Sequence, residues 1–235
     1  MKKMWLFVLA ALATFAVPSV ALASSIVVSL GNTAPTNPFN GGAPLVAGNV
    51  YGTAIINSNF VAPFFTGMCG GADDVGPNCD KSWTFNYVIP AGETITAASL
   101  SVGLSDLDSN QAGNQVALYQ VNGGDVLTGA LNTAAEALRG GAGALNNEYD
   151  VFSFALSNFG ALSGGNATVH LTFAGPGGGV LGGTNFNGGW IFFSTLNITT
   201  EQEAPVVPEP ASLLLLATGL GAGLRSRVRQ ALRRR

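Results

Sequence analysis

The sequence is poor in the side chains on which most active sites depend. It has one histidine, His170, and two cysteines among 235 residues. A Ser-His-Asp triad would have to use His170, and the chain contains no Gly-x-Ser-x-Gly motif. A zinc site needs three or four histidine, cysteine or acidic ligands, and the nitrogen and sulfur ligands here are too few. We therefore expect a protein without enzymatic activity and without a required cofactor.

Basic residues are almost absent from the middle of the chain. Between residues 24 and 207 only Lys81 and Arg139 are basic, against twelve aspartates and glutamates, so this segment has a net charge of −10 while the whole chain has −3. Because little in the segment could neutralise phosphates, we expect no nucleic-acid partner. Six of the ten basic residues lie instead in the last eleven positions.

Long charged helices are also absent, whereas glycine accounts for 32 residues. Apolar and polar residues alternate with a period of two, which predicts half-buried strands. The clearest are 81–89 and 98–104, followed by 115–121, 151–156, 168–174 and 190–198, with weaker candidates at 26–30, 49–56 and 59–65. One short helix is predicted at 133–139, with Asn132 capping its start and Gly140 its end. This pattern predicts an all-β fold, an antiparallel β-sandwich of jelly-roll type.

The two cysteines, Cys69 and Cys79, flank a turn-rich loop. In an exported protein a pair this close predicts a disulfide. A metal or redox pair is the alternative, but the Cys-x-x-Cys spacing and a nearby histidine are missing.

A short acidic segment is the candidate for a calcium site, which is the alternative to a protein without a cofactor. Asp106, Asp108 and Asn110 stand at alternate positions after a predicted strand, as at the start of many calcium loops. The EF-hand pattern then fails, because Gln111 and Ala117 stand where Gly and Glu are needed. Calcium at the edge of a β-sandwich, with distant ligands such as Asp125 or Asp150, is one interpretation. A solvated turn is the other, and we favour it.

Two further readings concern sugars. Trp83 and Trp190 could stack on sugar rings if exposed, although each begins an alternating strand and core packing is favoured. A secreted hydrolase would need two facing carboxylates, and the sequence does not pair Glu93, Glu136 or Glu148.

His170 falls on the polar side of its strand and is expected to be an exposed structural residue.

The N-terminus carries a secretory signal peptide. Lys2 and Lys3 precede an apolar run at 4–17, and Ala21-Leu22-Ala23 provides a small-x-small cleavage site before Ser24. A membrane anchor is the alternative, but the run is shorter than the roughly 20 residues that a span requires.

The C-terminus has three parts in a fixed order. Val207-Pro208-Glu209-Pro210 is followed by an apolar run at 213–224 and by the arginine tail. The run predicts a short transmembrane helix, and arginines collect on the cytoplasmic side, so the body is expected to face outward. The two prolines keep a helix from extending back through the motif, which leaves an extended backbone that a protease could bind.

This C-terminal segment resembles the PEP-CTERM sorting signal of Gram-negative bacteria that produce exopolysaccharide. The resemblance implies recognition by exosortase, a membrane-embedded cysteine protease or transpeptidase, after export by the secretion machinery. The expected organisation is a signal peptide at 1–23, a β-sandwich body at 24–199, a linker at 200–206 and the sorting signal at 207–235.

The expected product is therefore a structural or adhesive protein of the cell surface or exopolysaccharide matrix, bound to the membrane only before processing. A calcium-dependent or carbohydrate-binding module is the alternative, and a secreted hydrolase is a third hypothesis.

Overall fold

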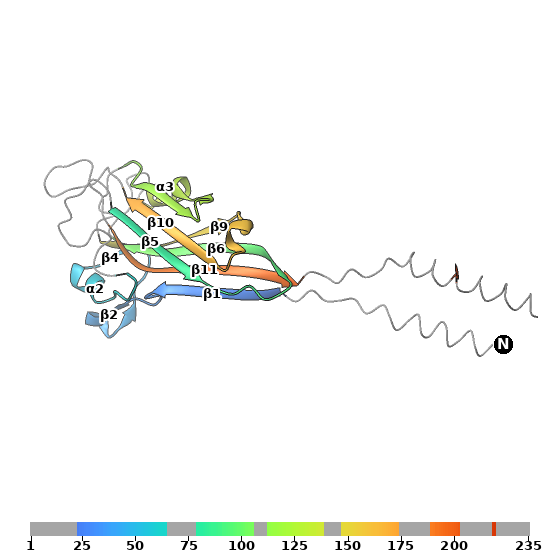
Figure 1. The fold of residues 1–235 in the computed structure, drawn as a ribbon. Helices are drawn as coiled ribbons and strands as arrows, with labels where there is room; N and C mark the ends of the chain where they lie inside the picture. Colours follow the sequence, from blue (N-terminus) through green and yellow to red (C-terminus); the bar gives the residue numbers. More distant parts are fainter. Residues whose placement is uncertain are drawn as a thin grey trace, which may run out of the picture. The chain divides into compact units, whose positions relative to one another are not determined.

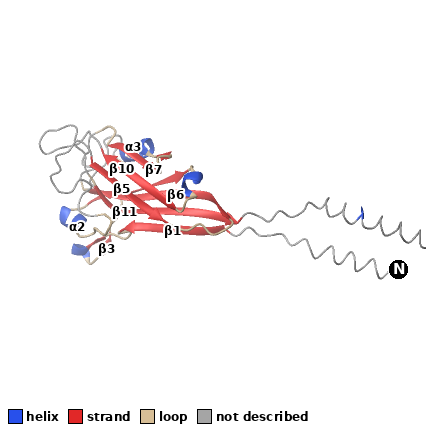
Figure 2. Cartoon of the chain, viewed as in Figure 1, coloured by secondary structure: helices blue, strands red, loops and turns tan. Residues whose placement is uncertain are grey.

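The strands of the body form where apolar and polar residues alternate. The computed structural model describes residues 23–64, 79–105, 112–138, 147–173, 189–202 and 218–219. The chain divides into two units, of which residues 22–202 form the body, while residues 1–21 and 203–235 form the other. The body is built of antiparallel strands with a few short helices (Figure 2). The all-β class is thus confirmed.

Two sheets make up most of the body (Figure 1). The first has the order β1 (Ala23–Gly31), β11 (Trp190–Gln202), β6 (Glu93–Ser105), β9 (Glu148–Leu156) and β4 (Asn49–Val50). The second has the order β5 (Cys79–Asn86), β10 (Asn166–Phe173), β7 (Val116–Val121) and β8 (Asp125–Val126). A separate small sheet pairs β2 (Thr36–Asn37) with β3 (Ala43–Pro44).

The connections between the strands follow a regular pattern. Without the short β2, β3 and β4, the remaining strands taken in chain order occupy positions 1-8-3-6 in the first sheet and 2-7-4-5 in the second. This is the strand order of a jelly roll, in which the chain crosses repeatedly from one sheet to the other.

The core lies between the inner faces of the two sheets. Alternate residues of each strand are buried there, because successive side chains of a strand point to opposite faces. The fully buried members include Leu100 and Val102 of β6, Leu196 of β11, Phe85 of β5 and Leu171 of β10. These are the positions that the alternation in the sequence predicts for 81–89, 98–104, 168–174 and 190–198.

A second, smaller apolar cluster covers part of the first sheet. It consists of Leu45, Ile56, Tyr149, Phe192 and Phe193. Ile56 comes from helix α2 (Thr53–Asn57), whereas the last three residues come from β9 and β11. The segment between β1 and β5 thus contributes a packed layer as well as connecting the two sheets.

The predicted strands in this segment are largely wrong. Residues 49–56 contain only the two residues of β4 before the chain enters α2, and residues 59–64 form turns or irregular backbone rather than a strand. The cause is Asn59, which is buried and whose side-chain amide bonds the backbone of two other elements. Its Nδ2 donates to Thr36 O (2.8 Å) and Ile55 O (2.7 Å), while its Oδ1 accepts from Thr36 N (2.7 Å).

The predicted helix exists, but it begins earlier. Helix α3 spans Thr128–Ala137, so Asn132 lies inside it and does not cap its start. The Asn132 side chain is buried against β7 instead, where its Oδ1 accepts from Gln115 N and Val116 N (2.9 Å each) and its Nδ2 donates to Val116 O (2.9 Å). Gly140, the predicted end, lies outside the described residues. Two further short helices are η1 (Pro38–Asn40) and α4 (Phe159–Leu162).

The two ends of the body lie side by side (Figure 1). β1 pairs antiparallel with β11, and Ala23 lies opposite Glu201. β11 continues to Gln202, so residues 200–202 belong to the sheet and not to the predicted linker. The chain therefore enters and leaves the body at the same end of the first sheet.

Candidate functional site at the ends of the body

One carboxylate joins the strands at which the body begins and ends. Glu93 is the first residue of β6 and lies opposite Gln202. Its Oε1 accepts a hydrogen bond from the Ser24 hydroxyl (3.0 Å), and its Oε2 accepts a short hydrogen bond from the Thr200 hydroxyl. Glu93 thus links β6 to both β1 and β11 at the junction with the terminal segments.

The signal residues can be placed only in part. Ala23 and Ser24 are the first residues of β1. Ala21, Pro208, Glu209 and Pro210 lie outside the described residues, as does most of the predicted membrane helix; Thr218 and Gly219 are helical. Among the helices that the structure describes, none is long and apolar enough to cross a membrane.

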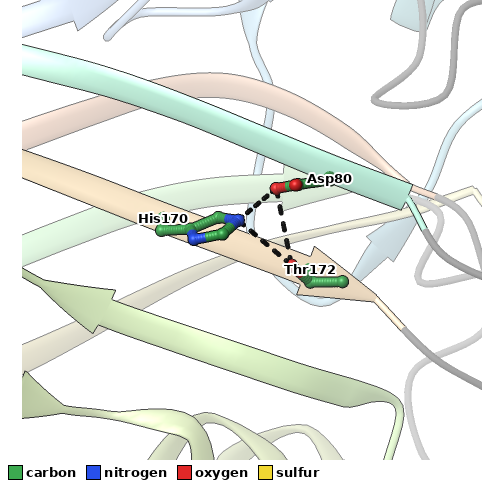
Figure 3. Close-up of polar contacts among 3 residues, drawn as sticks. All are labelled: Asp80, His170 and Thr172. Atoms are coloured by element: carbon green, nitrogen blue, oxygen red, sulfur yellow. Dashed lines mark hydrogen bonds and ion pairs between the residues drawn. The ribbon is translucent and has the colours of Figure 1, made fainter. Parts of the chain in front are cut away.

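The single histidine belongs to a small polar group on the second sheet (Figure 3). His170 Nε2 makes a short contact with Asp80 Oδ1 and lies 3.4 Å from Thr172 Oγ1, whose hydroxyl also donates to Asp80 Oδ1 (3.5 Å). Asp80 lies directly opposite Thr172, and His170 is diagonal to it, which is an ordinary cross-strand arrangement.

This arrangement does not match a catalytic triad. In a triad the carboxylate and the nucleophile contact opposite nitrogens of the imidazole ring, whereas here both partners contact Nε2. The side chains of His170 and Asp80 are 31% and 62% exposed, so solvent screens the pair. The group is best described as a surface pair that links β5 to β10.

The tryptophans considered for sugar binding pack inward to different degrees. Trp83 is 4% exposed, and its ring meets Phe64 edge to face, with centroids 5.3 Å apart. The expectation of core packing is confirmed for Trp83, which has no free face to offer a sugar. Trp190 is partly buried against the cluster of Phe192 and Tyr149.

Asp106, Asp108 and Asn110 lie outside the described residues, but two acidic residues face the strand that leads to them. Asp150 and Glu148 are buried in β9, and Asp150 lies opposite Leu104, two residues before Asp106. Gly48 N donates to Asp150 Oδ1 (3.1 Å). Within the part of the chain that the structure describes, no group of three or more acidic, histidine or cysteine side chains is arranged around a common point.

Asp125, the other distant ligand that we considered, has a structural role. Its Oδ1 accepts from Ser157 N (2.9 Å), Ser157 Oγ (2.7 Å) and Asn158 N (3.2 Å), and its Oδ2 also accepts from Asn158 N (3.0 Å). Burial raises the pKa of Asp125, but these hydrogen bonds outweigh it and bring the pKa below the ordinary value of 3.8. The carboxylate therefore holds the connection between β9 and α4.

The structure places one of the two cysteines and all three candidate hydrolytic glutamates. Cys79 begins β5, while Cys69 lies outside the described residues, so the disulfide stays a prediction.

Glu93 and Glu148 lie near opposite ends of β6, because Ser105 pairs with Tyr149. At about 3.3 Å per residue they are roughly 40 Å apart, too far to act on one glycosidic bond. Glu136 is on α3, where it accepts from Gly113 N.

Together the parts define a class of protein. The last strand of the body ends at Gln202, and a proline motif, an apolar run and an arginine tail follow it directly. This is the organisation of an exported protein with a C-terminal sorting signal.

Comparison with known families agrees. A family model described as the PEP-CTERM protein-sorting motif matches residues 206–230, so only residues 203–205 separate β11 from the match. The motif implies export, processing by exosortase and sorting to the surface of a Gram-negative cell. A search of curated proteins found no match to the chain.

Proposed function

We propose that the protein is a non-enzymatic structural or adhesive component of the cell surface or exopolysaccharide matrix. The observation that carries the proposal is the sorting motif directly after the last strand of a β-sandwich. Because Ala23 lies opposite Glu201, the signal peptide and the sorting segment attach at one end of the body. The exposed parts of the outer sheet faces are the surfaces that we propose for contacts outside the cell.

The outer faces have a composition that suits a hydrated polymer. Pairs of hydroxyl side chains bond across neighbouring strands, namely Ser29 with Thr195 (2.9 Å), Ser101 with Ser153 (2.8 Å) and Thr84 with Thr168 (2.9 Å). These groups are neutral, and each hydroxyl has both a donor and acceptors. These hydroxyl pairs can exchange hydrogen bonds with polysaccharide hydroxyls and add no charge of their own.

The sorting part of the proposal is tested by the mass of the mature protein from its native host. We expect the wild type to lack the arginine tail and a Pro208→Ala/Glu209→Ala/Pro210→Ala variant to retain it in the membrane fraction. Glu203→Ala, an acidic residue outside the matched segment, is the control and should be processed normally. A wild-type mature protein that still carries Arg225 to Arg235 would contradict the proposal.

The matrix part requires a separate measurement. Cells that lack the gene should lose a fraction of their surface-bound exopolysaccharide, and the wild-type gene should restore it, whereas the triple-alanine variant should not. Unchanged retention of polysaccharide in the deletion strain would remove the matrix role while leaving the sorting signal intact.

A calcium-binding module is the second candidate, and the position of Asp150 favours it. Asp150 is buried and pairs with Leu104 of the neighbouring strand β6. Leu104 lies two residues before Asp106 in the sequence, and Asp108 and Asn110 follow. If calcium binds there, it should raise the melting temperature relative to a sample in chelator, and Asp108→Asn should remove the effect. Glu201→Gln, which removes one acidic charge at the other end of β6, should keep it. Identical melting with calcium and with chelator would remove this candidate.

A further inference from the structure

The environment of Glu93 is short of positive charge. Its two oxygens accept hydrogen bonds from the Ser24 and Thr200 hydroxyls, which are both neutral. Lys81 is the only lysine or arginine among the described residues, and it lies on β5 of the second sheet. The other charged group on the strands at this end is Glu201 of β11, while β1 has no charged residue. A half-buried carboxylate in such a setting gains from a nearby cation.

Removal of the signal peptide would create that cation. The expected cleavage hydrolyses the Ala23–Ser24 peptide bond, with water supplying the hydroxyl of the new Ala23 carboxyl group and the hydrogen of the Ser24 amine. At neutral pH the α-amino group is mostly protonated, because its ordinary pKa is about 8. In a body with two basic side chains this ammonium is a large change in local charge.

The backbone geometry places the new ammonium on the side of β1 from which Glu93 reaches Ser24. Asn32 N donates to Phe192 O, and the same register places Ser24 opposite Thr200. Hydrogen-bonded pairs recur at every second residue of an antiparallel ladder, so Ser24 N also points toward β11. Glu93 reaches the pair from the next strand, β6. The Ser24 nitrogen lies within about 4 Å of its own hydroxyl, which already contacts the carboxylate.

We propose that Glu93 is the binding site for the α-ammonium of the mature N-terminus, so that cleavage of the signal peptide completes an ion pair that fastens β1 to the sheet. The inference rests on the proposed export and on cleavage before Ser24. It gives the exported form a contact that the precursor lacks, at the strand end beside which the sorting segment begins. Ser24 and Thr200 then serve as the neutral partners of the same carboxylate.

The test uses mature protein purified from its native host, compared as wild type, Glu93→Gln and Glu201→Gln. Intact mass first establishes whether the chain begins at Ser24. The pH dependence of amine acylation then gives the pKa of the α-amino group, and melting is followed from pH 7 to pH 10. Glu201→Gln is matched because it removes one charge from a residue that lies opposite Ala23.

In the wild type and in Glu201→Gln, the pKa of the α-amino group should lie above the ordinary value of about 8. The added stability should be complete below pH 8 and be lost as the pH rises through that raised pKa. Glu93→Gln should bring the pKa back to the ordinary range and abolish this loss. Ser24→Ala keeps the ammonium and should keep the loss, which separates the ion pair from the hydroxyl contact.

An unshifted α-amino pKa in a mature chain that begins at Ser24 would overturn the inference, as would a shift that persists in Glu93→Gln. A mature chain with another N-terminus would overturn it as well. None of these outcomes depends on the fate of the arginine tail, which tests the sorting proposal separately.

Discussion

At the scale of the residue, Tyr119 stabilises the core through its ring and not through its hydroxyl group. It is fully buried on β7, its hydroxyl has no hydrogen-bond partner among the described residues, and burial raises its pKa far above the usual 10. Tyr119→Phe should leave the free energy of unfolding unchanged or raise it by about 1–2 kcal/mol, because a desolvated hydroxyl is removed while the edge contact with Phe154 stays. Denaturant unfolding measures the change.

Tyr87 is the matched control for this substitution. Its hydroxyl donates to Leu162 O (2.6 Å), so Tyr87→Phe should lower stability by about 0.5–1.5 kcal/mol. A Tyr119→Phe variant that loses as much as Tyr87→Phe would show that the Tyr119 hydroxyl has a partner after all.

Asp125 should make stability depend on acid pH. Burial raises its pKa, but the hydrogen bonds from Ser157 and Asn158 together lower it by more, so the folded pKa is below the unfolded value near 3.8. A lowered carboxyl pKa gives stability that is present above the unfolded pKa and is lost as the pH falls through the folded pKa. Asp125→Asn should lower stability at pH 7 by about 1–3 kcal/mol and flatten the pH dependence below pH 4. Urea midpoints at pH 2.5, 4 and 7 test this, and equal slopes for the two proteins would contradict it.

At the scale of the element, Asn132 fixes helix α3 against β7. Asn132→Ala would leave the bonds of Gln115 N and Val116 N unmade in a buried place, and should lower stability by about 2–4 kcal/mol. Thr133→Ala is the control, because the Thr133 hydroxyl is exposed and donates to Gly129 O within the same helix. Thermal unfolding of the two variants should differ clearly, and similar losses would mean that α3 does not depend on this amide.

The same residue shows how far the sequence could predict the elements. The strands at 81–89 and 98–104 were predictable because one face of each is buried, so the period of two is visible in the chain itself. Asn132 and Asn59 were not, because their partners are backbone groups of other elements, up to 23 residues away. Local sequence suggests a cap for one and a strand for the other, and tertiary hydrogen bonds decide otherwise.

The candidate site divides in the same way. The sorting motif is linear, and its three parts can be recognised in the order in which they occur. Glu93 could not be assigned to the junction, since it contacts residues 69 and 107 positions away through the register of three strands. Nothing around Glu93 in the sequence distinguishes it from the other acids of the body.

At the scale of the whole molecule, the register of β11 predicts where the body can be cut. Thr200 is fully buried, bonds Glu93 and lies opposite Ser24, and Gln202 still pairs with Glu93. A protein that ends at Gln202 keeps all these contacts. One that ends at Thr199, the boundary expected from the sequence, loses the three pairs of residues 200–202 with β6 and the pair of Thr200 with Ser24 of β1. Both chains would be exported with the native signal peptide and compared by melting temperature.

The chain that ends at Gln202 should melt with the naturally processed protein. The chain that ends at Thr199 should lose about 1–3 kcal/mol for the missing hydrogen bonds, which for a body of this size corresponds to roughly 2–12 °C. Glu93→Gln should lower the melting temperature of both chains, and more in the longer one, because the shorter chain has already lost the Thr200 contact and keeps only the contacts of Glu93 with Ser24. Equal melting of the two truncated chains would mean that the ends of β1 and β11 do not stabilise the body. The contacts of Glu93 with these strand ends could then not stabilise the exported protein.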